Sequence, residues 1–374
     1  MKIVITGGGT GGHFYPLISV VENIREISEQ EKLIDAQIYY IAPEPYDERA
    51  LFDNEIIFKK NTAGKRRVYF SVRNFLDIFK IVWGVLTALW QIFIIFPDVV
   101  FAKGGYVSFP TLFAARLFRI PVIIHESDSV PGRVNLWASK FARRVAIAFP
   151  EALKFFPKEK VALVGNPIRK ELLSPTKNGA GEYFGLQDNV PTIFVLGGSQ
   201  GAERINEVIL ASLPELLKKY QVIHQTGLNN IKSVEGTAKV ILGVEESSRY
   251  KVFGYLDSLA MKMAAGLADL VVSRSGSGIF EIANWGIPSI LVPIPQSVSR
   301  DQHSNAYAYA GTGAAVVVEE KNLSSTLLLS EIDRILSDEN IAKEMSEMAK
   351  KFSPSDAGEK IAREILKLGL AHES

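Results

Sequence analysis

The chain has 374 residues, with 42 Lys and Arg against 41 Asp and Glu, and it contains no cysteine. The net charge of +1 gives no overall attraction to nucleic acid. The lack of cysteine excludes disulfides, cysteine-ligated metals and thiol nucleophiles. The length predicts two domains, because a single core seldom grows beyond about 250–300 residues.

The first half alternates short apolar runs with amphipathic stretches, which predicts βαβ units and a parallel sheet. The first strand runs directly into glycines and is unlike a signal peptide, so we expect a cytoplasmic protein. The predicted strands are Ile3–Thr6, Ala36–Ala42, Asp98–Ala102, Pro121–His125, Val145–Ala148 and Val161–Val164. The predicted helices are Leu17–Ser28, Ser108–Phe118 and Val134–Phe141.

The pattern then restarts after Pro175–Gly185, a segment whose composition predicts an exposed, irregular stretch. A strand, a glycine loop and a helix to about Lys219 follow, as at the N-terminus. We therefore predict two Rossmann-like domains, 1–166 and 167–353. The predicted strands of the second are Thr192–Leu196, Gln221–Gln225, Leu270–Ser273, Ser289–Val292 and Ala315–Val318, and Ser330–Leu370 is predicted to form two or three helices.

One segment of the first half, Ile78–Phe96, is apolar on nearly every side. A bilayer span needs about 20 apolar residues, but a strand follows this run at once, and Lys80 and Gln91 interrupt it. Residues 56–76 before it hold six basic side chains and no acidic one. We favour a helix that lies in the headgroup layer, with Lys59–Arg73 on anionic lipid, over a helix inside the core.

Two glycine loops follow predicted strands and precede helices. Backbone amides of such loops bind phosphate, and the helix dipole favours the anion. The first, Gly7 to His13, fits the dinucleotide pattern, but Glu44 comes late for a ribose ligand, so NAD binding is a weak alternative. The second, Gly197 to Gly201, lacks the lysine of an NTPase loop. Two such loops predict two phosphate-bearing ligands that face each other across a cleft, as in group transfer.

Seven motifs in register then make the chain resemble the MurG-type glycosyltransferases of peptidoglycan synthesis. The resemblance covers nearly the whole chain. The matching segments are Gly7–His13 (GGGTGGH), Gly104–Ser108 (GGYVS), His125-Glu126, Gly165–Arg169 (GNPIR), Gly197–Ala202 (GGSQGA), Arg274–Gly276 with Glu281–Ala283, and Asp301-Gln302 with Asn305-Ala306.

That resemblance implies a GT-B fold, with two Rossmann-like domains that face each other across a cleft. It implies that the N-terminal domain binds the acceptor and the C-terminal domain the donor, and that a final helix, about 354–374, packs back on the first domain. The implied reaction is inverting transfer of GlcNAc from UDP-GlcNAc to undecaprenyl-diphospho-MurNAc-pentapeptide (lipid I), giving lipid II. It requires neither a metal nor a cofactor, and it takes place peripherally on the cytoplasmic face of the membrane.

The resemblance also assigns residues to roles. His13 is the first choice for the catalytic base and Glu126 the competitor. The acceptor-binding residues are Thr10, Gly11, Gly12 and Tyr106. The donor-binding residues are Arg169, Ser199 and Gln200 at the diphosphate, Leu256 at the uracil, Glu281 at the ribose, and Asp301 and Gln302 at the sugar.

Three departures bear on these contacts: Ser127-Asp128 replaces a Gln-Asn pair, Asp301 replaces the first of two glutamines, and the spacing to Glu281 is one residue shorter. Other functions remain open. The same fold serves UDP-GlcNAc 2-epimerases, and a non-catalytic scaffold could keep it while binding lipid precursors.

Overall fold

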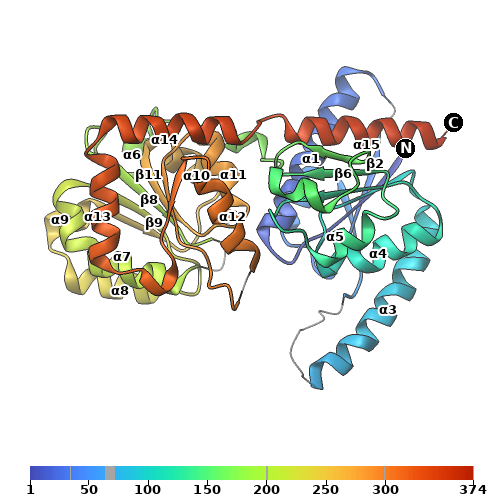
Figure 1. Cartoon of the computed structure of the whole chain (residues 1–374), viewed down its shortest axis with the longest axis horizontal. Coiled ribbons are helices and arrows are strands. Elements are labelled where there is room, and N and C mark those ends of the chain that lie inside the picture. The colour runs from blue at the N-terminus through green and yellow to red at the C-terminus, as the bar shows by residue number, and fades with distance from the viewer. Residues whose placement is uncertain (34, 64–71, 199–200, 299, 374) are drawn as a thin grey trace. The chain divides into compact units, whose positions relative to one another are not determined.

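The computed structural model describes residues 1–33, 35–63, 72–198, 201–298 and 300–373. It divides into two compact units, Met1–Arg169 with Ser355–Ser374, and Lys170–Pro354. Each unit is built on one parallel sheet covered by helices (Figure 1). The predicted class, two α/β domains with parallel sheets, is confirmed. The boundary between the units lies three residues beyond the predicted one.

The N-terminal unit holds a seven-stranded sheet in the order β3-β2-β1-β4-β5-β6-β7. The side chains of β1 alternate: Ile3 and Ile5 enter one apolar cluster and Val4 enters another. The sheet is therefore buried on both faces, as expected of a parallel sheet. The strands are β1 (Lys2–Thr6), β2 (Gln37–Ala42), β3 (Ile56–Lys60), β4 (Val99–Ala102), β5 (Val122–Glu126), β6 (Arg144–Ile147) and β7 (Val161–Leu163).

Helices cover the two faces of this sheet in distinct groups. The first cluster includes side chains of α1 and α15, and the second includes side chains of α3, α4 and α5. The helices are α1 (Gly11–Gln30), α2 (Glu48–Asp53), α3 (Val72–Ile95), α4 (Gly105–Leu117), α5 (Arg133–Ala138) and α15 (Ala357–Glu373), with a 3-10 turn at Pro150–Phe155.

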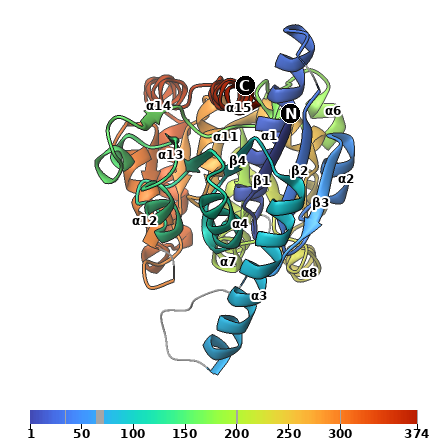
Figure 2. The ribbon, with the colours of Figure 1, turned by 90° about the vertical axis from the view of Figure 1, so that its right-hand side faces the viewer.

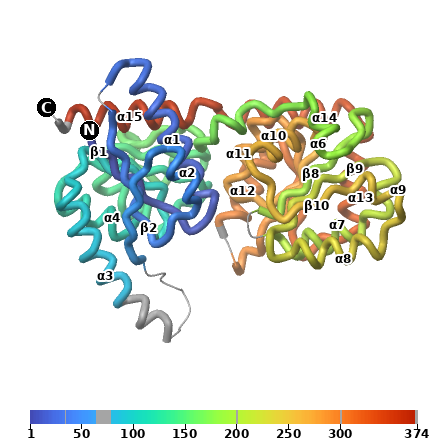
Figure 3. Tube along the Cα trace, turned by 180° about the vertical axis from the view of Figure 1, so that it is seen from behind, coloured from blue at the N-terminus to red at the C-terminus, as the bar shows by residue number. Residues whose placement is uncertain are grey.

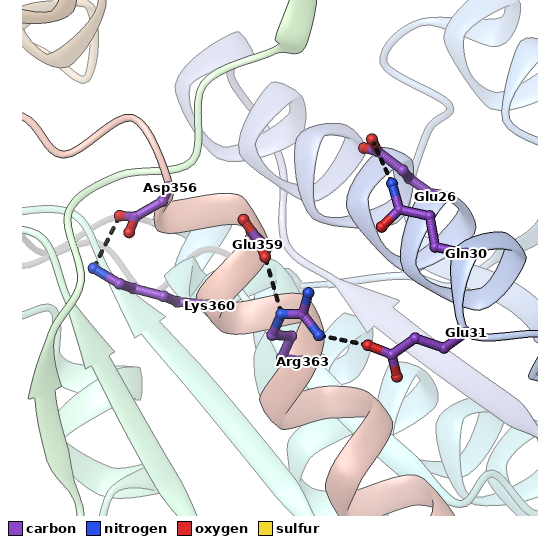
Figure 4. Close-up of polar contacts among 7 residues, drawn as sticks. All are labelled: Glu26, Gln30, Glu31, Asp356, Glu359, Lys360 and Arg363. Atoms are coloured by element: carbon purple, nitrogen blue, oxygen red, sulfur yellow. Dashed lines mark hydrogen bonds and ion pairs between the residues drawn. The ribbon is translucent and has the colours of Figure 1, made fainter.

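The last helix, α15, packs along α1 although more than 300 residues separate them in the chain. Ile361 and Ile365 are buried in the cluster that α1 lines. At the rim, the Arg363 guanidinium donates to Glu31 at the end of α1 and to Glu359 on its own helix, at 2.7 and 2.9 Å (Figure 4). The helix is thus held mainly by its apolar face.

Truncation of Ile365 to Ala should destabilise the N-terminal unit by about 2–5 kcal/mol, because a fully buried side chain leaves a cavity. Arg363→Ala should have a much smaller effect, since its ion pairs are exposed to solvent. Urea unfolding of the two variants measures the difference. Equal losses would show that the ion pairs, and not the apolar face, hold α15.

The C-terminal unit repeats the architecture with six parallel strands in the order β10-β9-β8-β11-β12-β13. Figure 3 shows α7 and α8 on one side of this sheet and α10 and α11 on the other. The strands are β8 (Thr192–Leu196), β9 (Gln221–Gln225), β10 (Tyr250–Phe253), β11 (Ala268–Ser273), β12 (Ser289–Leu291) and β13 (Ala315–Val317). The helices are α6 (Ala180–Phe184), α7 (Glu203–Lys219), α8 (Ile231–Ile241), α9 (Val244–Ser248), α10 (Ser258–Leu267), α11 (Gly278–Trp285), α12 (Arg300–Ala310), α13 (Ser325–Leu336) and α14 (Glu339–Phe352), with 3-10 turns at Lys170–Leu172 and Glu320–Asn322.

Several predicted elements need correction. The segment Pro175–Gly185 is not wholly irregular and exposed, because α6 lies within it and buries Ala180 and Phe184. Helix α1 begins at Gly11, six residues before its predicted start, and it includes Pro16, a residue type that usually marks a helix boundary. Strands β3 and β10 were not predicted, since each has part-exposed side chains and no continuous apolar run.

Helix α3 has one buried face and one exposed apolar face. Ala88, Ile92 and Ile95 are buried against the sheet, whereas Trp83 and Trp90 are exposed. The alternative of a helix that lies wholly inside the core is therefore wrong. Gln91 donates to the Lys60 carbonyl at 2.9 Å, which places this polar group of the helix against the end of β3. The exposed apolar side chains, here called the α3 outer face, are Phe79, Val82, Trp83, Leu86, Trp90, Phe93 and Ile94.

The N-terminal end of α3 projects beyond the rest of the N-terminal unit (Figure 2). Among the described residues, no helix combines the length and apolar character needed to cross a bilayer. Of the predicted basic segment, Lys59 and Lys60 are exposed. Lys65, Arg66 and Arg67 lie outside the described residues, as does the side chain of Arg73.

Candidate active site

The strand order of the N-terminal sheet reverses between β1 and β4, and the segments that follow these strands meet there. In open α/β sheets, ligands bind at such points, beyond the carboxyl ends of the strands. The glycine loop 7–12 follows β1, and Lys103 follows β4. Gly7 has φ of 144°, and a Cβ on it would lie 2.8 Å from the Lys103 Cβ. Glycine is required here because the loop backbone lies against Lys103.

The predicted acceptor-binding residues belong to this loop or lie beside it. Thr10 is the N-cap residue of α1, and Gly11 and Gly12 begin the helix. The first amides of a helix lack partners within it, and together with the helix dipole they favour an anion. Tyr106, in the first turn of α4, approaches from the other side, because a Cβ on Gly9 would lie 3.9 Å from its hydroxyl.

His13 lies in the first turn of α1 with its ring against Gly105, where a Cβ would be 3.8 Å from Nδ1. Nδ1 is buried and has no hydrogen-bond partner within the described part of the chain. Burial lowers the pKa of His13 below its ordinary 6.5, and the nearby ammonium of Lys103 lowers it further, against opposing effects of Asp128 and of the Lys103 carbonyl. The imidazole is therefore neutral at pH 7. One ring nitrogen donates to that carbonyl, so the other can take up a proton.

Glu126, the second candidate base, ends β5 and is buried. Its carboxylate accepts from the amides of Asp128 and Gly132 at 3.0 and 2.9 Å and from the Asn135 side chain at 3.0 Å. Burial, followed by the like charge of Asp128, raises the pKa of Glu126 to about 7, although the three hydrogen bonds favour the ionised form. A carboxylate with such a pKa is suited to exchange a proton at neutral pH.

Arg169 belongs to the N-terminal unit in the structure. Its guanidinium lies 4.0 Å from the centroid of the Tyr15 ring, a cation–π contact. Tyr15 is on α1, two residues after His13, and its hydroxyl donates to Asp47 at 3.3 Å. This contact places the guanidinium beside the start of α1.

In the C-terminal unit, the corresponding reversal of strand order lies between β8 and β11. The predicted sugar-binding residues Asp301 and Gln302 begin α12, and the Ser275 hydroxyl of the loop after β11 donates to the Gln302 carbonyl at 2.7 Å. A Cβ on Gly276 would lie 3.7 Å from the Gln302 amide nitrogen. The structure thus joins the loop after β11 to the start of α12.

Two further predicted donor-binding residues of this unit, Glu281 and Leu256, are within the described residues. Glu281 is half-buried in the first turn of α11, which follows the loop directly. Leu256 is buried, and its amide donates to the Gln225 side chain at the end of β9 at 3.0 Å. Ser199 and Gln200 lie outside the described residues. Within the described ranges, no cluster of three or more histidine or carboxylate side chains could hold a metal ion.

Comparison with known proteins identifies the family. The Glycosyltransferase family 28 N-terminal domain matches residues 3–147, and the family's C-terminal domain matches residues 192–361. The chain belongs to glycosyltransferase family 28. A UDP-N-acetylglucosamine--N-acetylmuramyl-(pentapeptide) pyrophosphoryl-undecaprenol N-acetylglucosamine transferase of Bacillus cereus is 34% identical over 97% of this chain and 99% of its own length.

Solved structures agree with this assignment and with the GT-B fold. Acinetobacter baumannii MurG superposes with a TM-score of 0.73 at 26% identity, over 98% of this chain and 99% of that one. A UDP-GlcNAc 2-epimerase from Neisseria meningitidis, bound to UDP-GlcNAc, gives a TM-score of 0.68 at 16% identity, over 98% and 100% of the two chains. The second likeness shows the fold alone.

For this family 28 enzyme, the sequence analysis overlooked Lys103. It is 1% exposed, and its Nζ lies 2.8 Å from the Asn166 Oδ1 and 2.6 Å from the His125 Nδ1. The sequence does place a lysine between an apolar strand and two glycines, but a side chain that follows a strand is usually exposed to solvent. His125, which the sequence motif included without a role, is one of the two hydrogen-bond partners of Lys103.

Proposed function

We propose that this chain transfers GlcNAc from UDP-GlcNAc to a MurNAc hydroxyl of undecaprenyl-diphospho-MurNAc-pentapeptide (lipid I), giving lipid II and UDP. The observation that carries the proposal is the 34% identity to the Bacillus cereus transferase over 97% of this chain. Both glycine loops and the candidate base residues fall within the residues that the two family domains match, 3–147 and 192–361.

On the acceptor side, the loop at Thr10, Gly11 and Gly12 would hold the diphosphate of the lipid, with Tyr106 beside it. His13 would take the proton of the MurNAc hydroxyl as its oxygen bonds to the anomeric carbon of GlcNAc. The bond from that carbon to the UDP oxygen breaks in the same step, so the configuration inverts. Glu126, whose carboxylate is buried in the same unit, would serve if His13 does not.

On the donor side, Arg169 and the loop that holds Ser199 and Gln200 would neutralise the UDP diphosphate. Glu281 would accept from the ribose hydroxyls, and Leu256 would contact the uracil through its backbone. Asp301 and Gln302 would bind the GlcNAc hydroxyls. The buried Gln302 Oε1 has no partner within the described ranges, which fits a hydrogen bond to a ligand.

The α3 outer face, within Ile78–Phe96, would hold the enzyme peripherally on the cytoplasmic face of the membrane, with Lys59–Arg73 on anionic lipid. Large exposed apolar patches on monomers mark interaction sites. The lipid-linked acceptor is embedded in the bilayer, so a membrane-bound enzyme would meet it in place.

The direct test incubates the protein with labelled UDP-GlcNAc, with and without lipid I. Label in lipid II that requires both substrates is expected. Formation of a 2-epimer from UDP-GlcNAc alone would instead support an epimerase. If neither lipid II nor the 2-epimer forms, a non-catalytic binding scaffold would be favoured.

Replacement of Glu281 by Ala should weaken UDP binding about ten- to hundred-fold, since hydrogen bonds to a charged group contribute roughly 1.5–3 kcal/mol. Titration calorimetry with UDP measures the effect, and binding of lipid I should be retained. Glu339→Ala is the matched control, because Glu339 also occupies the first turn of a helix in the C-terminal unit and is exposed. Unchanged UDP affinity in the Glu281 variant would refute the ribose assignment.

A further inference from the structure

Lys103 occupies an unusual place for a lysine, since its ammonium lies between neutral partners in the interior of the N-terminal unit. His125 Nε2 lies 2.9 Å from the Gly165 carbonyl, so this nitrogen carries the proton and donates. Nδ1 of the same ring therefore accepts from Lys103. Burial and Lys103 both lower the pKa of His125, so the ring is neutral. Asn166, at 2.8 Å, accepts a second ammonium proton through Oδ1.

Packing alone does not call for a charge at this position. Removing an ammonium from water costs several kcal/mol, and well-packed apolar replacements of buried charges are often neutral or stabilising. Burial accordingly lowers the pKa of Lys103 to about 7, while the carboxylates of Glu126 and Asp128 raise it. A lysine that is placed here despite the free-energy cost of its desolvation points to a function for its ammonium.

The charged and titratable groups that face Lys103 come from three segments: His13 on α1, His125 and Glu126 on β5, and Asp128 just after β5. An attraction between two charges belongs to the pair, so the ammonium favours the ionised form of Glu126 as much as that carboxylate favours the ammonium. The three N–H groups on Glu126 also fit a carboxylate. The ammonium disfavours protonation of His13.

Lys103 therefore acts on both candidate bases in the direction that a general base requires, an ionised carboxylate and a neutral imidazole. Asp128 acts in the opposite direction on both, because its negative charge favours a proton on Glu126 and on His13. Position 128 thus holds a carboxylate where the sequence motif led us to expect an amide, and the ammonium of Lys103 opposes its effect on His13.

We propose that Lys103 is a positioning residue of the transfer reaction: its buried ammonium, held by His125 and Asn166, offsets Asp128 and keeps the catalytic base deprotonated. This inference rests on the proposed transferase activity.

The test is the pH dependence of kcat/KM for Lys103→Met, which keeps the length of the side chain and removes the charge. Loss of a nearby positive charge raises the pKa of a base, so the pH at which kcat/KM falls, the acid limb of the profile, should rise by about one unit. The variant should then lose about tenfold in rate at pH 6, with little loss at pH 9. Lys158→Met, which removes an exposed charge from the same unit, should leave the profile unchanged.

Asp128→Asn separates the charge effect from a structural one. In the Lys103→Met background, it should return the acid limb toward that of the wild type, and alone it should move the limb down. If Lys103 merely holds His125 and Asn166 in place, Asp128→Asn will not restore the profile, and the inference is overturned.

If Lys103→Met fails to fold, as judged by thermal unfolding, the single Asp128→Asn variant decides the matter, and an unmoved limb refutes the inference. A wild-type protein that transfers no GlcNAc would instead refute the proposed function. The two failures are therefore distinguishable.

Discussion

Loss of the His13 imidazole should slow GlcNAc transfer about 10²–10⁴-fold while UDP-GlcNAc binding stays nearly unchanged. That range is typical for removal of a general base. His13 is on the N-terminal unit, and its buried Nδ1 has no hydrogen-bond partner among the residues that the structure describes. Steady-state kinetics of His13→Ala, with donor affinity measured by calorimetry, give the two quantities.

The wild-type pH profile distinguishes His13 from Glu126 independently of mutation. A base is active when deprotonated, so kcat/KM should fall as the pH drops through its pKa. If His13 is the base, the fall should occur below pH 6.5, since burial lowers its pKa. If Glu126 is the base, the fall should centre near pH 7.

Glu126→Gln is the companion variant, and it keeps the shape of the side chain. In either orientation its NH2 group would face an N–H donor, that of Asp128 or those of Gly132 and Asn135, so its folding must be checked by thermal unfolding. Normal turnover in His13→Ala, with loss of turnover in a folded Glu126 variant, would assign the base to Glu126.

The sequence predicted the order of strands and helices well because each buried strand is a short apolar run. It missed β3 and β10, where side chains such as Lys59 and Lys251 interrupt that pattern. It also predicted that the glycine loops follow strands, and the structure shows that those strands, β1 and β8, lie where the strand order of each sheet reverses. The local sequence pattern was sufficient to predict these strands and loops, because each apolar run and the glycines that follow it lie within a few residues of each other.

Lys103 could not be recognised in this way. Its partners are 22 and 63 residues away, and only the tertiary fold brings them to its ammonium. Taken alone, a lysine after a strand predicts a solvated side chain. The exposed face of α3 posed a similar problem, since a helix that is apolar on all sides does not reveal which side is buried.

The Trp83→Ser, Trp90→Ser, Phe93→Ser triple variant should release the protein from anionic liposomes. These side chains are 65%, 64% and 58% exposed, so their loss leaves the core intact. Each large apolar side chain contributes roughly 1.5–3 kcal/mol when it is fully buried, and partial insertion of three should weaken binding by at least a hundredfold. Co-sedimentation with anionic and neutral vesicles measures the effect, and salt should weaken wild-type binding through the basic residues.

The matched control removes three exposed apolar side chains from the C-terminal unit, Leu228, Val240 and Val244, and should leave liposome binding unchanged. The α3 variant should also keep its activity on a short-chain, water-soluble lipid I analogue, because its catalytic groups are untouched. Ile92→Ser, on the buried face of the same helix, should instead unfold the N-terminal unit. If the triple variant stays folded and still sediments with anionic vesicles, the α3 outer face is not the membrane contact, and some other surface must hold the enzyme near its lipid substrate.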